Sequence, residues 1–122
     1  MLVLAGTRKG LFVLRSSDGD RRRFEIEGPH LTGWEVFHAL RDPRDGTLYA
    51  ATNNLVYGGT VHRSTDGGET WERADELGLP EGSGLKLEKT WHVEPGRADE
   101  PGRLWLGGAP GVLFRSDDGG RT

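Results

Sequence analysis

Cysteine is absent from this chain of 122 residues, so disulfide bonds and thiol chemistry are excluded. Long apolar runs are missing as well, and no stretch approaches the roughly 20 residues that a membrane-spanning helix needs. The apolar stretch at the N-terminus, residues 1–5, stops before Arg8 and Lys9 and is too short for the apolar region of a signal peptide. We therefore expect a cytoplasmic protein without a membrane partner.

Neither sign of charge is in large excess, since the formal net charge is only -3 at pH 7. No overall field favours nucleic acid as a partner, and the one basic run, residues 21–23, fits a solvated turn or a contact with an anion or a partner. The four histidines, His30, His38, His62 and His92, show no spacing typical of a zinc site. We expect no metal and no cofactor.

Glycine and proline, in contrast, are plentiful, with 20 and 6 residues. Together with many turn signals and no long segment of apolar residues at helical spacing, they predict an all-β, loop-rich chain. Only residues 73–79 suit a helical turn. The hydrophobic fraction of 34% is thin for an independent core.

One short motif occurs twice. Residues 64–71 read Ser-Thr-Asp-Gly-Gly-Glu-Thr-Trp, and residues 116–122 read Ser-Asp-Asp-Gly-Gly-Arg-Thr, ending one residue before the expected tryptophan. The glycines supply backbone freedom for a tight turn, and the serine and aspartate side chains can bond its unpaired amides. We expect structural roles in these turns for Ser64, Asp66, Gly68, Thr70, Trp71, Ser116, Asp118, Gly120 and Thr122.

The segments before the motif repeat as well. Residues 48–52 and 59–64 match residues 104–108 and 111–116. A degenerate third copy opens the chain at residues 2–7 and 10–16, with Leu2 aligned to Leu48, and leads into residues 17–20 without the Thr-Trp end. The repeated serines, at positions 16, 64 and 116, stand about 50 residues apart, a period typical of propeller blades.

The pattern Ser-x-Asp-x-Gly-x-Thr-Trp resembles the BNR or Asp-box repeat of sialidase-like β-propellers and of several non-enzymatic propellers. The resemblance implies about two and a half four-stranded antiparallel blades of an incomplete propeller, within one segment, 1–122. Blade 1, which would lack the first of its four strands (A) and contain the other three (B to D), would cover 1–27, blade 2 36–74 and a truncated blade 3 90–122. Because closed propellers have four to eight blades, we expect an N-terminal fragment, with the remainder of the propeller in the full-length chain.

In the Asp-box family the motif lies on the face opposite the active site, so the resemblance implies that functional residues lie on the other rim. There we expect the loops 7–10, 28–35, 53–58, 74–89 and 108–111. Aromatic faces beside amides suit sugar rings and also protein contacts, although such loops occur as plain connectors too. The candidate ligand-binding residues are Trp34, His38, Asn53, Asn54, Tyr57, Trp91 and His92.

Two carboxylates, Glu35 and Glu88, are the catalytic candidates. Each lies beside Trp34 or Trp91 and just before the strand that would be innermost in its blade, next to the central channel. The resemblance implies a glycoside hydrolase, yet the Arg-Ile-Pro motif of true sialidases is missing. The alternative is a non-catalytic propeller scaffold for protein–protein interaction or assembly. His38 and His92 are either structural or face the central channel of a propeller. When the two repeats are aligned by counting back from Pro43 and Pro95, His38 takes the same position as Thr90 and not that of His92.

Overall fold

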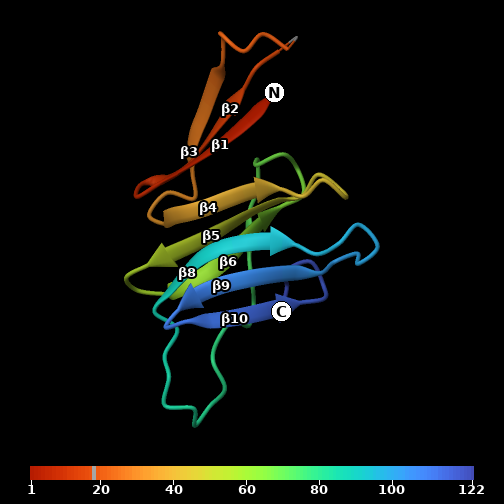
Figure 1. The fold of residues 1–122 in the computed structure, drawn as a ribbon. Coiled ribbons are helices and arrows are strands. Elements are labelled where there is room, and N and C mark those ends of the chain that lie inside the picture. The colour runs from red at the N-terminus through yellow and green to blue at the C-terminus, as the bar shows by residue number, and fades with distance from the viewer. Residues whose placement is uncertain (18) are drawn as a thin grey trace.

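The computed structural model describes residues 1–17 and 19–122, and the prediction of an all-β chain is confirmed (Figure 1). The strands form three antiparallel sheets, with the orders β1-β2-β3, β4-β5-β6-β7 and β8-β9-β10, none of which closes on itself. They are β1 (Leu2–Thr7), β2 (Gly10–Arg15), β3 (Glu25–His30), β4 (Glu35–Arg41), β5 (Leu48–Asn54), β6 (Gly58–Ser64), β7 (Glu72–Arg73), β8 (Lys89–Pro95), β9 (Leu104–Ala109) and β10 (Val112–Ser116).

Two local predictions need correction, and a third lies outside the described residues. Residues 73–79 form no helical turn, because Arg73 belongs to strand β7 and the residues after it are irregular. The described residues contain no helix, so none is long and apolar enough to cross a membrane. Strand β3 continues to His30, beyond the expected end at residue 27, because Gly28 approaches Leu11 so closely that a Cβ would lie 2.8 Å from its carbonyl oxygen. Asp18, in the degenerate first motif, lies outside the described residues.

The alignment of the first repeat is also displaced by one residue. Leu2 pairs with Arg15, as Tyr49 pairs with Arg63 and Trp105 with Arg115. Leu2 therefore corresponds to Tyr49, whereas the sequence comparison aligned it with Leu48. The turn between β1 and β2 is one residue shorter than the turn between β5 and β6, which accounts for the displacement.

The sheets pack face to face, with the four-stranded sheet in the middle (Figure 1). Successive side chains of β5 point to opposite faces. Ala50 accordingly belongs to the core cluster shared with the first sheet, which also contains Leu11, Val13 and Val36. Ala51 belongs to the cluster shared with the third sheet, whose other buried members are Tyr49, Val61, Val93, Leu104 and Leu106. Strand β5 is therefore buried on both faces.

Candidate functional site

The two complete motif turns are held by the same contacts. In the first, Ser64 Oγ donates to Asp66 Oδ1 at 2.7 Å and accepts from the Gly68 N–H at 2.9 Å. The Thr70 N–H donates to Asp66 Oδ1 at 2.9 Å, and the Thr70 hydroxyl also donates to this carboxylate. Hydrogen bonds from Thr70 and Ser64 lower the pKa of Asp66 to about 2. The carboxylate is thus occupied within its own turn.

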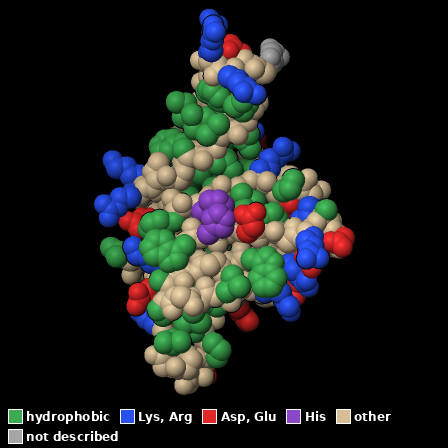
Figure 2. Space-filling view, viewed as in Figure 1, with side chains coloured by type: hydrophobic (Ala, Val, Ile, Leu, Met, Phe, Trp, Pro, Cys, Tyr) green, Lys and Arg blue, Asp and Glu red, His purple; other side chains and the backbone are tan. Residues whose placement is uncertain are grey.

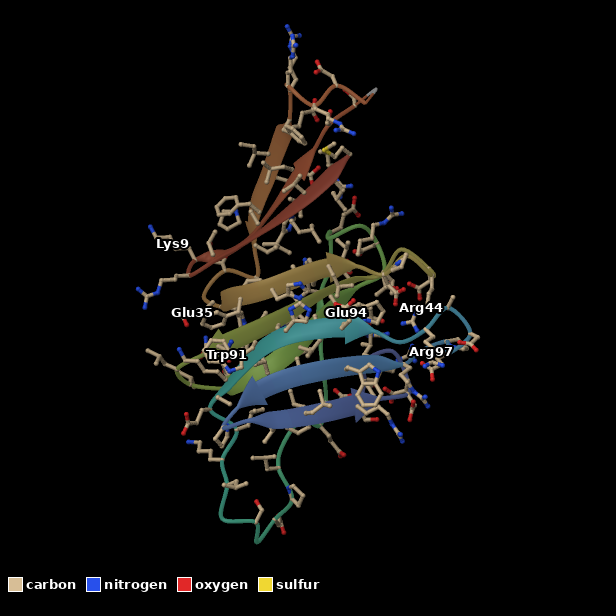
Figure 3. All side chains as sticks on the ribbon, in the orientation of Figure 1. Lys9, Glu35, Arg44, Trp91, Glu94 and Arg97 are labelled. Atoms are coloured by element: carbon tan, nitrogen blue, oxygen red, sulfur yellow. The ribbon has the colours of Figure 1, made fainter. Side chains whose placement is uncertain are left out.

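The second turn repeats this arrangement. Ser116 Oγ donates to Asp118 Oδ1 at 2.7 Å and accepts from the Gly120 N–H at 3.0 Å. The Thr122 N–H and hydroxyl donate to Asp118 at 3.0 and 2.7 Å, and these bonds hold the pKa of Asp118 well below its usual range. The two turns follow the C-terminal ends of β6 and β10, whereas the loops 53–58 and 108–111 lie at the N-terminal ends of these strands. The motif turns and these loops are therefore at opposite ends of the sheets. Figure 3 shows Lys9, Glu35 and Trp91 at one end of the sheets and Arg44 and Arg97 at the other.

On the face formed by β4 and β8, the rings of His38 and His92 stack, with centroids 3.8 Å apart. Both strands carry a bulge, after Val36 and after Thr90, and the histidines follow these bulges at equivalent positions. The alignment of His38 with Thr90 is therefore wrong, because the prolines from which it was counted do not stand at equivalent positions of the two repeats. Figure 2 shows histidine side chains gathered in the middle of this face, beside a carboxylate.

Each histidine of the stacked pair has a polar partner on β8. His38 Nδ1 accepts the Val93 N–H at 3.4 Å, and His92 Nε2 lies 3.1 Å from Glu94 Oε2. Burial lowers the pKa of His38, the neighbouring charge of His92 lowers it further, and Glu94 opposes both effects. His38 therefore favours the neutral form, with Nδ1 as the acceptor.

The bulge residues themselves, Phe37 and Trp91, form an aromatic pair. Their ring centroids lie 5.1 Å apart at 65°, and the two residues remain 42% and 45% exposed. Lys89 Nζ lies 5.2 Å from the centroid of Phe37 and 5.9 Å from that of Trp91. A cation over exposed aromatic faces makes a platform for apolar surfaces that carry polar groups.

A cleft of about 580 Å³ lies next to this platform. Both catalytic candidates, Glu35 and Glu88, line it together with Arg8 and Lys89. Glu35 Oε1 lies 3.3 Å from Arg8 Nε in an exposed ion pair. The structure therefore brings the two carboxylates selected from the sequence to one cleft, which also borders Leu55 and Val56.

Asn53 lies at this cleft but is committed to the scaffold. Its amide is buried, donating to the Thr90 carbonyl at 2.9 Å and accepting the Thr90 N–H at 2.8 Å. The side chain thus bridges β5 and β8. Because both polar groups of the Asn53 side chain bond Thr90, neither is available to a ligand, in contrast to the ligand-binding role expected from the sequence. Asn53 instead positions the wall of the cleft.

The remaining candidates are Asn54, at the end of β5 and in the lining of the cleft, and Trp34 and Tyr57 in the adjoining loops. Asn54 Nδ2 donates to the Gly33 carbonyl at 2.8 Å, and its Oδ1 accepts the Val56 N–H at 2.7 Å. Tyr57 stacks on Trp34 at 5.9 Å, and Trp34 meets the edge of His62 at 4.7 Å. Trp34 and Tyr57 therefore support these loops and do not join the platform.

Sequence reasoning did not select Phe37 or Glu94. The signal was present, since an aromatic residue precedes a histidine at both 37–38 and 91–92. Within residues 1–17 and 19–122, no group of three or more histidine, aspartate or glutamate side chains is placed to hold a metal ion. No family model matches the chain, and a search of curated proteins gives no match.

Proposed function

We propose that the chain is part of an Asp-box β-propeller of the sialidase-like or glycosyl-hydrolase-like class, and that the rim opposite the motif turns binds carbohydrate. The repeated relation between neighbouring sheets supports the propeller. Arg15 in the first sheet donates to the Gly67 carbonyl of one motif turn at 2.6 Å, and the Asp75 N–H, which follows the second sheet, donates to the Arg121 carbonyl of the other at 2.9 Å. Each turn thereby contacts the preceding sheet.

The aromatic pair is the observation that carries the carbohydrate proposal. Exposed rings stack on the C–H faces of a sugar, while nearby charged groups bond its hydroxyls. Phe37 and Trp91 offer such faces, and Lys89 lies both over their rings and in the adjoining cleft. A sugar on the platform extends into the cleft toward Glu35 and Glu88.

Hydrolysis would use the two carboxylates in complementary roles. One protonates the leaving glycosidic oxygen, and the other either attacks the anomeric carbon or activates a water molecule. Both Glu35 and Glu88 line the cleft, which supports these roles. Replacing either by Gln removes its proton-transfer capacity while preserving its shape. We expect turnover of aryl glycosides to be lost in both variants while binding to the platform is retained.

The binding test compares Trp91→Ala with Leu113→Ala by calorimetric titration against a panel of oligosaccharides. Loss of a stacking contact worth about 1.4 kcal/mol weakens binding roughly tenfold. Leu113 is exposed on β10 and outside the platform, so its replacement should leave affinity unchanged. Equal affinity of the two variants, or no sugar bound by the parent chain, would contradict the proposal.

A non-catalytic scaffold is the second candidate, supported by the tip of the β5–β6 loop. Leu55 and Val56 are 107% and 80% exposed, and Asn54 holds the backbone of this tip in a fixed turn. A preorganised apolar knob suits a protein contact. If a purified partner is identified, a Leu55→Ser/Val56→Ser variant should lose it while Trp91→Ala retains it; the reverse result favours the platform.

A further inference from the structure

All three lysines of the chain, Lys9, Lys86 and Lys89, lie at the end of the sheets opposite the motif turns. Lys9 stands in the turn between β1 and β2, and Figure 3 shows it at this end. Lys89 begins β8, and Lys86 lies three residues before it, where the Glu88 N–H donates to the carbonyl of Ala109, the last residue of β9, at 3.0 Å. We call this end the lysine rim, made of the loops 7–10, 53–58 and 85–89.

The lysine rim is positively charged although the chain as a whole is not. Its three loops contain Arg8 and the three lysines against one carboxylate, Glu88, whereas the formal net charge of the chain is -3. Arg8 is paired with Glu35, which lies beside the rim. Among the described residues, no carboxylate lies within ion-pair distance of a lysine ammonium group. The lysines are therefore available to an anionic partner.

The tip of the β5–β6 loop lies among these cations and is apolar. Leu55 and Val56 are 107% and 80% exposed, and the Val56 N–H donates to Asn54 Oδ1 at 2.7 Å, which fixes the backbone of the tip. Both apolar residues line the same cleft as Arg8 and Lys89, so apolar and basic groups are neighbours at the rim. These two side chains contribute nothing to the core and are positioned for a contact outside the molecule.

We propose that the lysine rim docks on the surface of a lipid bilayer that contains anionic lipids. Leu55 and Val56 enter the boundary between headgroups and acyl chains, and the lysines stay at the level of the headgroups, whose negative charges they meet. Binding at a bilayer surface depends on this combination of buried apolar area and electrostatic attraction. The expectation of no membrane partner considered apolar segments long enough to span, which surface binding does not need.

An acidic protein is the competing occupant of the rim, and the scaffold alternative assigns the Leu55–Val56 tip to a protein. Two observations favour the bilayer. The cations come from separate loops on either side of the tip, as contact with an extended flat surface requires. They also include every lysine of the chain, and lysine is depleted in protein–protein interfaces, where arginine is enriched. Docking uses the loops and not the aromatic platform, so it does not depend on carbohydrate binding.

The test measures cosedimentation of the chain 1–122 with phosphatidylcholine vesicles that contain or lack phosphatidylserine. We expect binding only where phosphatidylserine is present, and weaker binding at high salt. Lys9→Gln/Lys86→Gln should weaken binding by about 30-fold, at roughly fivefold for each cation near an anionic surface. Leu55→Ser/Val56→Ser should weaken it by roughly tenfold or more, because the apolar contact is lost.

Arg21→Gln/Arg22→Gln is the matched control, since it removes the same charge from the loop between β2 and β3, at the end of the sheets that carries the motif turns. It should bind vesicles like the parent chain. Lys9 and Lys86 are exposed and lie outside the platform and the cleft, so circular dichroism and oligosaccharide affinity should be unchanged in their double variant. Failure of the docking proposal is thereby separated from failure of the carbohydrate proposal.

Three results overturn the proposal. The first is no binding that depends on phosphatidylserine. The second is equal affinity of the Lys9→Gln/Lys86→Gln variant and the matched control. The third is vesicle binding that Leu55→Ser/Val56→Ser leaves unchanged and that soluble polyglutamate abolishes, because the rim then recognises an acidic polymer such as an acidic protein and not a bilayer.

Discussion

His62 shows how one buried side chain links stability to pH. It is 6% exposed, Thr52 Oγ1 lies 2.9 Å from its Nδ1, and the Trp34 ring makes a T-shaped contact with its ring. Burial, followed by the charge of Arg73, lowers the pKa of His62 to about 4. Folding thus selects the neutral imidazole.

We predict a loss of stability on mild acidification. Above a pH of about 6.5 the histidine is neutral in both states and has no effect. As the pH falls from about 6.5 to about 4, the unfolded chain takes up the proton first, so the free energy of unfolding decreases, by up to about 2 kcal/mol at pH 5. Urea unfolding at pH 7 and pH 5 measures the change.

His62→Gln is the matched variant, since it keeps a polar side chain but does not titrate. Its stability should depend less on pH over the same interval, with a residual contribution from His38, whose pKa is also lowered. The motif carboxylates titrate below this interval, because the pKa of Asp66 is about 2. An unchanged pH dependence in His62→Gln would contradict the assignment.

At the scale of the strand, the bulges in β4 and β8 determine which side chains reach the candidate site. One extra residue moves every following side chain to the other face. The bulges therefore place His38 against His92 and leave Phe37 and Trp91 exposed as a pair. Asn53 fixes the strands relative to each other by bonding both backbone groups of Thr90.

We predict that Asn53→Ala destabilises the chain by about 2 to 4 kcal/mol, because two buried backbone groups of Thr90 lose their partners. Asn53→Asp should also destabilise it, since a carboxylate accepts the Thr90 N–H but donates nothing to its carbonyl. Asn54→Ala, at the half-buried end of β5, is the control and should cost less. The midpoint of urea unfolding measures the difference, and equal midpoints for Asn53→Ala and Asn54→Ala would rule out the bridge.

Over the whole molecule, stability depends on stacking three small sheets. Strand β1 ends its sheet, so one of its edges has no strand partner among the described residues. Val3 on this strand is 41% exposed, and Leu2 and Leu4 border an open groove with Ala39 and Leu40 of β4. Such an edge is a template for pairing with another chain.

We predict that the chain 1–122 self-associates in a concentration-dependent manner and that Val3→Lys reduces this association, because a charge at an exposed edge disfavours strand pairing. Leu85→Lys, which adds the same charge in a loop, should have little effect. Light scattering after size exclusion gives the mass of each variant. A monodisperse monomer for the parent chain at all concentrations would contradict the prediction.

The sequence by itself determined the local features: the all-β class, most strand positions and the motif turns. Each depends on neighbours within a few residues, such as the Gly67–Gly68 turn beside Asp66, so spacing alone indicates it. It also supplied Glu35 and Glu88, which prove to line one cleft. The end of β3 and the alignment of Leu2 were missed, because a glycine contact and a shorter turn set them.

Only the tertiary structure decided which distant side chains meet. His38 and His92 stack because two bulges, far apart in the chain, set the same register on adjacent strands. Asn53 looked like a ligand contact until its bond partners on Thr90 were seen. Pairing between strands depends on the summed packing of whole sheets. Residue patterns therefore predicted the turns, which are local, but could not predict which side chains meet in the candidate site.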